Sequence, residues 1–242
     1  MRALTQSDPT RYQSGVPPPG PLEEDRLSRL YRERFSADDR AFKERAWAIL
    51  CERVFQPLIR TTDTVVDLGA GHCEFINAIE CGRKIAVDLN PEVKRHAMDA
   101  EFIQTTGTDL SSLDAGSVNV VFSSNFLEHL PDKQAVLHTL DECHRILAAE
   151  GTLIVLMPNI RYLNGRYWDY FDHYTPLTHH SLVEALGLLG FHPLRVLPRF
   201  LPYTVNQRSV PKSTLLLRLY LRVPFIWPLF GRQMLVVARR SE

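Results

Sequence analysis

The segment Val65–Cys73 (VVDLGAGHC) constrains the fold of this chain more than any other. An apolar, strand-like run reaches Asp67 and then enters a turn that contains Gly69 and Gly71. Glycine has no Cβ, so the backbone of such a turn can approach a ligand closely. The helix expected after the turn would direct unpaired backbone N–H groups at that ligand. The segment therefore predicts a nucleotide-like ligand held between a strand and a helix.

Strand-like and helix-like stretches alternate through the middle of the chain. Apolar runs predict strands at residues 64–68, 84–89, 101–105, 118–123, 151–157, 194–197 and 233–238. Helical patterns lie at residues 72–80, 91–98 and 132–147, and a later helix is expected to follow Thr178. Asp132 and Thr178 are candidates for the N-cap residues of their helices. Such alternation predicts a parallel sheet covered by helices on both faces, with ligands beyond the carboxyl ends of the strands.

The remaining segments extend this core at both ends. The chain has 242 residues, 45% of them hydrophobic, which fits one α/β domain with extensions. Residues 1–21 are polar and proline-containing and predict a disordered leader, and residues 22–60 predict a helical lid that Asp38 could divide in two. The core is expected at residues 61–198 and 232–240, with a helical, amphipathic insertion at 199–231. Four scattered cysteines and the lack of a signal peptide favour a cytoplasmic location.

The charge of the chain is balanced overall but uneven along its length. Lys+Arg and Asp+Glu are both 28, which argues against a polyanion partner for the whole molecule. From Phe191 onward, Glu242 is the only acidic residue, and the basic residues are Arg195, Arg199, Arg208, Lys212, Arg218, Arg222, Arg232, Arg239 and Arg240. This excess indicates an anionic substrate or an anionic lipid surface nearby, or else a solvated face. Residues 213–230 could contact a membrane peripherally, cap the substrate pocket or form a homodimer contact.

Three acidic residues help to identify the ligand. A dinucleotide-binding turn would have a third glycine where Glu74 stands, and no P-loop Gly-Lys-Ser/Thr is present. Asp67, Asp88 and Asp109 instead end or follow three successive predicted strands. Such a rim repels phosphates, suits the cationic sulfonium of S-adenosylmethionine, and can bind ribose hydroxyls. The alternative for each acid is a helix cap or a surface charge.

The motifs together resemble those of the class I S-adenosylmethionine-dependent methyltransferases, in the broad group of small bacterial enzymes that act on sugars, lipids and natural products. The resemblance covers about residues 61–191 and the last strand. It rests on VVDLGAGHCEF (65–75), AVDLNP (86–91), GTDL (107–110), FSSNFLEHLPD (122–132), PNIRYLNGRYWDYFDHYTPLT (158–178) and LLGF (188–191). It implies a Rossmann-like, doubly wound α/β fold with a mostly parallel seven-stranded sheet and an antiparallel last strand. It also implies S-adenosylmethionine as cofactor and S-adenosylhomocysteine as product.

The resemblance further implies a set of cofactor-binding residues. The turn residues Asp67, Gly69, Ala70 and Gly71 would lie against the methionine part of the cofactor. Asp88 and Leu89 would contact the ribose, and Asp109 and Leu110 would border the adenine. Asn125 and Phe126 would lie below the sulfonium. From the lid, Tyr31 and Arg34 could close over the cofactor, and Arg34 could pair with its carboxylate. Cys73 departs from the small residue found at its position in many relatives.

Two histidines are candidates for the base that a hydroxyl acceptor requires. His129 follows the fourth strand, and His173 lies in the loop after the fifth, beside Asp172. His129 could instead be structural, and an already nucleophilic acceptor would need no base. The same loop is rich in aromatic residues, so we expect Tyr162, Trp168, Tyr170 and Tyr174 to contact the acceptor, unless packing alone explains them. We expect no metal, because no carboxylate cluster is predicted beside this loop.

These observations predict O-methylation of a small glycan, a lipid-linked molecule or a natural product. The alternatives are C- or N-methylation of a natural product and a non-catalytic, regulatory module that binds S-adenosylmethionine. A nucleic-acid substrate is not expected, because no Asn/Asp-Pro-Pro-Tyr/Phe tetrapeptide follows the fourth strand. No apolar run approaches the ~20 residues of a membrane span.

Overall fold

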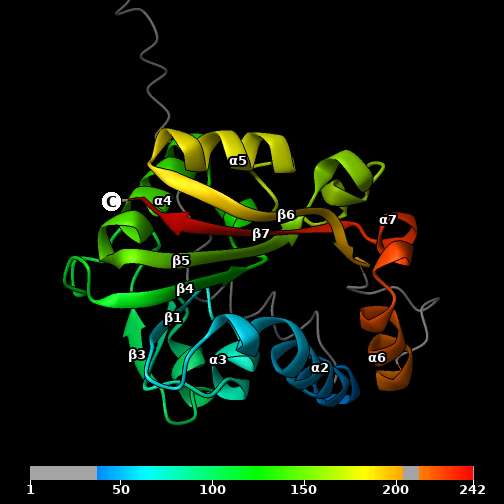
Figure 1. Ribbon diagram of the computed structural model, residues 1–242, viewed down its shortest axis with the longest axis horizontal. Helices are drawn as coiled ribbons and strands as arrows, with labels where there is room; N and C mark the ends of the chain where they lie inside the picture. Colours follow the sequence, from blue (N-terminus) through cyan, green and yellow to red (C-terminus); the bar gives the residue numbers. More distant parts are fainter. Residues whose placement is uncertain (1–36, 204–212, 242) are drawn as a thin grey trace, which may run out of the picture.

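A seven-stranded sheet forms the centre of the computed structural model, which describes residues 37–203 and 213–241 (Figure 1). Its strand order is β3-β2-β1-β4-β5-β7-β6. The strands are β1 (Thr64–Leu68), β2 (Arg83–Asp88), β3 (Glu101–Gln104), β4 (Val118–Ser124), β5 (Leu147–Pro158), β6 (Phe191–Leu201) and β7 (Gln233–Arg240). Strands β1 to β5 pair in parallel, and β7 is antiparallel to both β5 and β6. The predicted mostly parallel sheet with an antiparallel last strand is confirmed.

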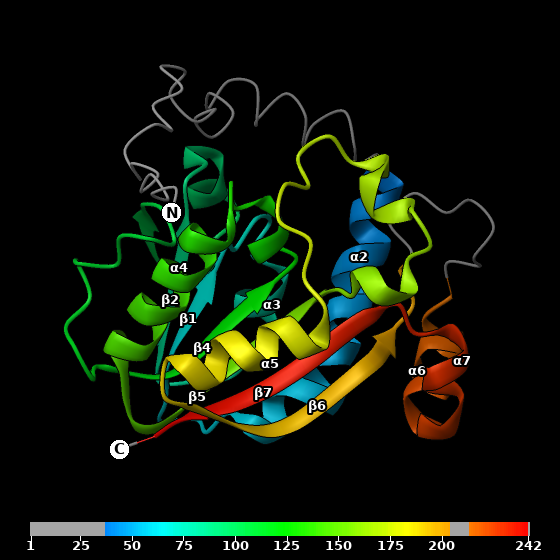
Figure 2. The same ribbon diagram turned by 90° about the horizontal axis from the view of Figure 1, so that it is seen from above.

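Helices cover both faces of this sheet. On one face lie α4 (Lys133–Ile146) and α5 (His179–Leu188), and on the other α2 (Ala37–Leu50) and α3 (Glu74–Ala78) (Figures 1 and 2). Successive residues of β1 point to opposite faces of the sheet. Val66 belongs to the hydrophobic cluster with residues of α4 and α5, and Val65 belongs to the cluster with residues of α2 and α3. This alternation follows from the two-residue period of a strand.

Two connecting helices are shorter than predicted. Cys73 has a left-handed conformation with φ of 59°, so α3 begins only at Glu74, and Ile79 is already extended. The helix expected at 91–98 is a short 3-10 helix, η3 (Pro91–Arg95), whose cap residue Asn90 accepts a hydrogen bond from the backbone N–H of Glu92.

The lid sequence continues from α2 into a π-helix, η1 (Cys51–Phe55), and a 3-10 helix, η2 (Gln56–Leu58). Asp38 lies near the start of α2, so the described part of the lid is not divided there. The predicted leader and the lid residues Tyr31 and Arg34 lie outside the described residues.

The predicted insertion begins inside a strand, because β6 pairs with β7 as far as Leu201. It then contains α6 (Thr214–Arg222), η7 (Pro224–Ile226) and α7 (Trp227–Phe230), at one end of the sheet (Figure 1). The indole N–H of Trp227 donates to the carbonyl of Tyr220, whose hydroxyl donates to the carbonyl of Phe200. None of the described helices is long and apolar enough to cross a membrane.

Candidate active site

The two glycines of the turn after β1 have different surroundings. Gly69 and Gly71 have φ of +73° and +54°, in the left-handed region that favours glycine. A Cβ on Gly69 would lie 2.6 Å from ring atoms of Phe126, whereas one on Gly71 would meet nothing within 4 Å. Gly69 therefore packs against the protein, and Gly71 faces open space in which a ligand can approach the backbone.

Asp88, at the carboxyl end of β2, is held against this turn. Its carboxylate accepts hydrogen bonds from the backbone N–H groups of Gly71 and Asn90, each 2.9 Å long. Burial raises the pKa of Asp88, and these two hydrogen bonds lower it in part. Each carboxylate oxygen keeps a further lone pair, so the geometry suits a bidentate interaction with the ribose hydroxyls.

Asp67 lies deeper, at 3% exposure. Burial raises its pKa well above the usual range, and the neighbouring carboxylates of Glu74 and Asp88 raise it further. Three acidic groups thus gather around one turn and favour a cationic ligand over a phosphate. The residues present therefore fit S-adenosylmethionine, which would bring a sulfonium and an ammonium group to this turn.

The residues predicted at the sulfonium and the adenine have clear positions. Phe126 fills the space between two glycines, because a Cβ on Gly107 would also lie 2.8 Å from its ring. Asn125 beside it has a left-handed φ of 48°. The side chain of Leu110 is fully buried in the core. Asp109 is exposed, and hydrogen bonds from the side chain and then from the backbone N–H of Ser111 lower the pKa of its carboxyl group. It therefore caps a local turn, and its contact with adenine stays a prediction.

Helix α2 brings basic residues to the turn. Lys43 forms an ion pair of 2.9 Å with Glu74. Next to this pair is a cavity of about 310 Å³, lined by Arg40, Ala41, Glu44, His72, Glu74 and His96. Sequence reasoning missed Arg40 and Lys43, although their i, i+3 spacing placed both on one helix face.

On the acceptor side, the loop after β5 folds back onto the short helix η4 (Leu127–His129) that follows β4. The backbone N–H groups of Tyr174 and Thr175 donate to the carbonyl of Glu128, at 2.9 and 3.1 Å. The hydroxyl of Thr175 donates to the carbonyl of Leu130 at 2.7 Å. These bonds bring Asp172 and His173 beside Glu128 and His129.

We call these four residues, Glu128, His129, Asp172 and His173, the acceptor-side cluster. His129 Nδ1 lies 2.8 Å from the backbone carbonyl oxygen of Asp172 and 3.3 Å from its carboxylate. The two imidazole rings are edge to face, with centroids 5.0 Å apart. Both predicted base candidates are thus in one place, and the histidine that Asp172 contacts is His129.

Glu128 is the member that sequence reasoning missed. Its side chain is fully buried, and neither carboxylate oxygen forms a hydrogen bond with another described residue. Burial raises the pKa of Glu128 to about 8; a hydrogen bond from its own backbone N–H lowers it in part, and the charge of Asp172 raises it slightly. Its position beside His129 was visible in the sequence, but nothing there indicated that the fold would bury it unpaired.

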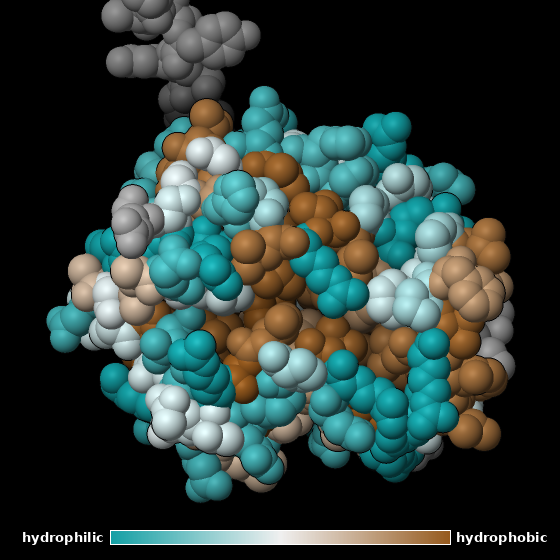
Figure 3. Space-filling model, viewed as in Figure 1, coloured by the Kyte–Doolittle hydropathy of each residue, from teal (hydrophilic) through white to brown (hydrophobic). Residues whose placement is uncertain are grey.

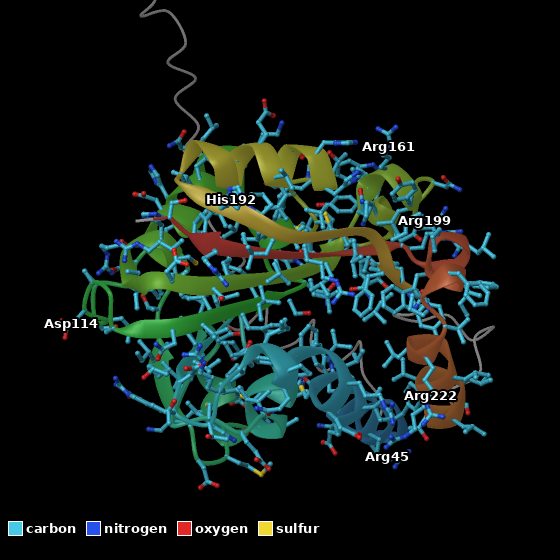
Figure 4. The ribbon with its side chains drawn as sticks, in the orientation of Figure 1. Arg45, Asp114, Arg161, His192, Arg199 and Arg222 are labelled. Carbon is cyan, nitrogen blue, oxygen red and sulfur yellow. The ribbon has the colours of Figure 1, made fainter. Side chains whose placement is uncertain are left out.

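The aromatic loop combines packing with exposed rings. Tyr167 is fully buried and its hydroxyl donates to the carbonyl of Thr175, while Tyr170 stacks on His173 with centroids 5.0 Å apart. Trp168 and Tyr174 are 57% and 37% exposed. The guanidinium of Arg199 lies over the ring of Tyr162, 4.9 Å from its centroid, and Figure 4 shows Arg199 at this end of the molecule.

Comparisons with known proteins agree with this architecture. Residues 66–155 match the family model described as "Methyltransferase domain". A chain of the complex between the Haloferax volcanii Trm112 methyltransferase activator and a putative methyltransferase has a TM-score of 0.67 and 21% identity, covering 90% of this chain and 97% of that chain. A SAM-dependent methyltransferase from Archaeoglobus fulgidus has a TM-score of 0.61 and 20% identity, covering 81% and 94%. The comparison with curated proteins found no match.

A more distant similarity is to geranyl diphosphate C-methyltransferase from Streptomyces coelicolor A3(2), in complex with Mg²⁺, geranyl diphosphate and S-adenosyl-L-homocysteine. Its TM-score is 0.56 at 12% identity, covering 81% of this chain and 78% of that chain. Residues 66–155 thus match a methyltransferase domain, and the fold is the one expected for a class I S-adenosylmethionine-dependent methyltransferase. The cofactor predicted from the turn, S-adenosylmethionine, agrees with this family match.

Proposed function

We propose that this methyltransferase transfers its methyl group to a hydroxyl oxygen. The observation that supports this is the acceptor-side cluster, which gathers proton-accepting groups beyond the carboxyl end of β4. A hydroxyl must lose its proton before or during attack on the methyl carbon, and a positioned acid–base group assists that loss. His129 is oriented by Asp172 at 2.8 Å, as such a group needs to be. A non-catalytic module would not require this arrangement.

The aromatic loop favours a sugar-like acceptor. Trp168, Phe171 and Tyr174 expose ring surface beside the cluster, and Phe171 is 81% exposed. Aromatic faces offer large apolar surfaces of the kind that can cover one side of a sugar ring. We therefore place the acceptor among small or lipid-linked glycans, ahead of a polyketide or other natural product.

The test uses S-adenosylmethionine with a ¹³C-labelled methyl group and a panel of glycan, phenol and amine acceptors. The chemical shift of the transferred methyl carbon identifies its new bond. We expect an O-methyl product, and a turnover loss of about 10²- to 10⁴-fold in His129→Gln, the range typical of a positioned acid–base group. His138→Gln, on the far exposed side of α4, is the matched control.

A methyl group found on nitrogen or carbon would contradict the proposal. Full turnover in both His129→Gln and His173→Gln would exclude the cluster from proton removal. Cofactor binding without transfer to any acceptor would instead favour the regulatory module.

The C-terminal helices support the lipid-linked form of the acceptor. On α6, η7 and α7 the exposed apolar side chains are Leu215, Leu216, Leu219, Phe225, Leu229 and Phe230. Figure 3 shows brown surface at this end of the molecule, and Figure 4 shows Arg222 extending from α6. Residues 191–241 contain no acidic side chain. Apolar groups next to basic ones fit an anionic lipid surface, so we propose that residues 213–230 contact one.

Co-sedimentation with vesicles tests this contact. We expect binding to vesicles of phosphatidylglycerol and phosphatidylcholine, weaker binding to phosphatidylcholine alone, and loss of binding in the double variant Phe225→Ser/Phe230→Ser. Phe171→Ser, equally exposed but at the aromatic loop, is the control. Binding that ignores the anionic lipid would contradict the proposal, and a dimer in light scattering that the double variant abolishes would show that a second copy covers this face.

A further inference from the structure

We propose that Glu128, His129 and His173 form a binding site for a divalent transition-metal ion of the zinc or manganese type. Each residue offers one ligand atom, and the three atoms lie within 4.8 Å of one another. In a tetrahedral zinc site with bonds of about 2.0–2.1 Å, ligand atoms lie about 3.3 Å apart. Small side-chain rotations would therefore close the set around an ion.

The burial of Glu128 is an independent reason to place a cation here. Its side chain has 0% exposure, and its two oxygens find no hydrogen-bond donor in the rest of the described chain. Buried carboxylates are ordinarily paired, hydrogen-bonded or bound to a metal. Protonation alone would leave a buried hydroxyl that also lacks a partner. A metal ion satisfies this group, and the fold holds the group in place through the hydrogen bonds that its carbonyl accepts from Tyr174 and Thr175.

The contact between His129 and Asp172 is a third observation. A histidine that binds a metal through one ring nitrogen commonly donates its other N–H to a backbone carbonyl or a carboxylate. His129 Nδ1 meets both groups of Asp172, the carbonyl at 2.8 Å and the carboxylate at 3.3 Å. Because Nδ1 meets Asp172, we assign Nε2 of His129 as its ligand atom.

The set of donor atoms indicates the class of metal. Two imidazole nitrogens and one carboxylate oxygen suit Zn²⁺, Mn²⁺ or Fe²⁺, whereas Mg²⁺ and Ca²⁺ prefer oxygen ligands. The sequence predicted no metal, because no carboxylate cluster was expected beside this loop, and only the folded loop brings His173 to Glu128 and His129. Three protein ligands leave coordination positions open, as in catalytic sites.

The role of the ion, though not its existence, rests on the proposed O-methylation. With the ion bound, His129 would act as a ligand and not as the proton acceptor. An acceptor hydroxyl bound at an open position would lose its proton to solvent more easily, because the cation stabilises the oxyanion. The oxygen would then form its bond to the methyl carbon as the carbon–sulfur bond breaks, and S-adenosylhomocysteine would leave. No oxidant or reductant is needed.

Isothermal titration calorimetry on the full chain, stripped with EDTA and without cofactor or acceptor, tests the site directly. The probes are ZnCl₂, MnCl₂ and MgCl₂ alone. We expect one Zn²⁺ or Mn²⁺ per chain, weaker binding of Mg²⁺, and a higher Tm with the bound ion. Glu128→Gln and His173→Gln should lower affinity at least 100-fold, and Asp172→Asn, which acts through His129, by about 10- to 100-fold.

His96→Gln is the matched control, because His72 and His96 form a second histidine pair with the same 5.0 Å ring separation. Its affinity should equal that of the wild type. Circular dichroism verifies that each variant folds. If Glu128→Gln does not fold, Asp172→Asn still tests the site. The proposal is overturned if no ion binds stoichiometrically, if Glu128→Gln, His173→Gln and Asp172→Asn all bind like the wild type, or if only His96→Gln loses the ion.

These results separate the site from the reaction. An ion that binds to a protein which methylates carbon or nitrogen would leave the site established and the proposed O-methylation wrong. O-methylation by a protein that binds no ion would support the proposed function and refute the metal site.

Discussion

The two glycines of the cofactor turn differ in the space that they leave for an added side chain. Gly71→Ala places a Cβ in open space, so its cost in folding free energy is the left-handed backbone, about 1–2 kcal/mol. Gly69→Ala adds a clash at 2.6 Å with Phe126, and overpacking adds about 1–3 kcal/mol. Urea unfolding should therefore rank Gly69→Ala as the less stable variant.

The cofactor affinity of the same two variants is informative, because the Cβ of Gly71→Ala occupies the space that we assign to the ligand. Calorimetry should show at least a tenfold loss, about 1.4 kcal/mol. If Gly71→Ala binds S-adenosylmethionine like the wild type, the ligand does not approach the turn there.

Asp88→Asn removes a charge but keeps the shape of the side chain. Asp88 accepts hydrogen bonds from two backbone N–H groups, and in the variant the amide NH₂ group would face one of these donors. The ribose hydroxyls would also lose a charged acceptor. Hydrogen bonds to charged groups contribute about 1.5–3 kcal/mol, so affinity for S-adenosylmethionine should fall about 10- to 100-fold. Asp114→Asn, on an exposed loop at the edge of the molecule (Figure 4), is the control. Unchanged affinity in Asp88→Asn would refute its assignment.

At the residue scale, the sequence predicted what a local motif encodes. Asp67, Gly71 and Asp88 meet at one turn because the ends of neighbouring parallel strands are adjacent. Glu128 could not be predicted, because its burial depends on a loop more than forty residues away folding onto its carbonyl group. Asp109 shows the opposite case, in which a residue of the right type satisfies a purely local turn.

At the scale of elements, helix α5 depends on its N-terminal cap. The side chain of Thr178 accepts from the backbone N–H of Ser181, whose hydroxyl in turn accepts from the N–H of Thr178. Thr178→Ala should lower the free energy of unfolding by about 1 kcal/mol. Ser181→Ala should lower the free energy of unfolding by less, because the side chain of Thr178 still accepts from the backbone N–H of residue 181. Urea unfolding measures the free energy of both variants. An equal or larger loss in Ser181→Ala would contradict this assignment of roles.

The bounds of elements were predictable where the signal was local. Strand β1 and the cap of α4 at Asp132 appear where the sequence placed them. Strand β6 is much longer than its apolar run, because pairing with β7 recruits exposed residues such as His192 and Arg195. Partners distant in sequence supply the hydrogen bonds, so no short window of residues could reveal this length.

For the whole molecule, the cysteines report how tightly the two faces of the sheet are packed. Cys51, Cys73 and Cys143 are buried, and burial raises the pKa of each, to about 12 for Cys73 and Cys143. Thiol reagents require the thiolate. Burial also raises the pKa of Cys81, but this thiol is only half-buried and can reach solvent. Ellman's reagent should therefore modify only Cys81 in the native protein, and the other three after unfolding. Cys81→Ser should remove the native reaction; rapid modification of a second thiol would show that one face is open.

The buried Asp67 links stability to pH. In the unfolded chain its pKa is about 3.9, whereas burial and then Glu74 raise the pKa of Asp67 in the folded protein. The folded state therefore binds the proton more tightly than the unfolded state. The stability contributed by this group is complete below the unfolded pKa and is lost as pH rises through the folded one.

Asp67→Asn removes this titration while keeping an oxygen that can accept from the backbone of Ile76. Without cofactor, urea unfolding should show that the variant gains stability relative to the wild type as pH rises above about 4. Other titrating groups cancel in the difference between the variant and the wild type. A difference that stays flat with pH would contradict the raised pKa. Above the folded pKa the ionised carboxylate of Asp67 adds to the negative potential that favours a sulfonium. In that pH range the more stable variant should therefore also bind S-adenosylmethionine more weakly, as expected where a site is built against the stability of its fold.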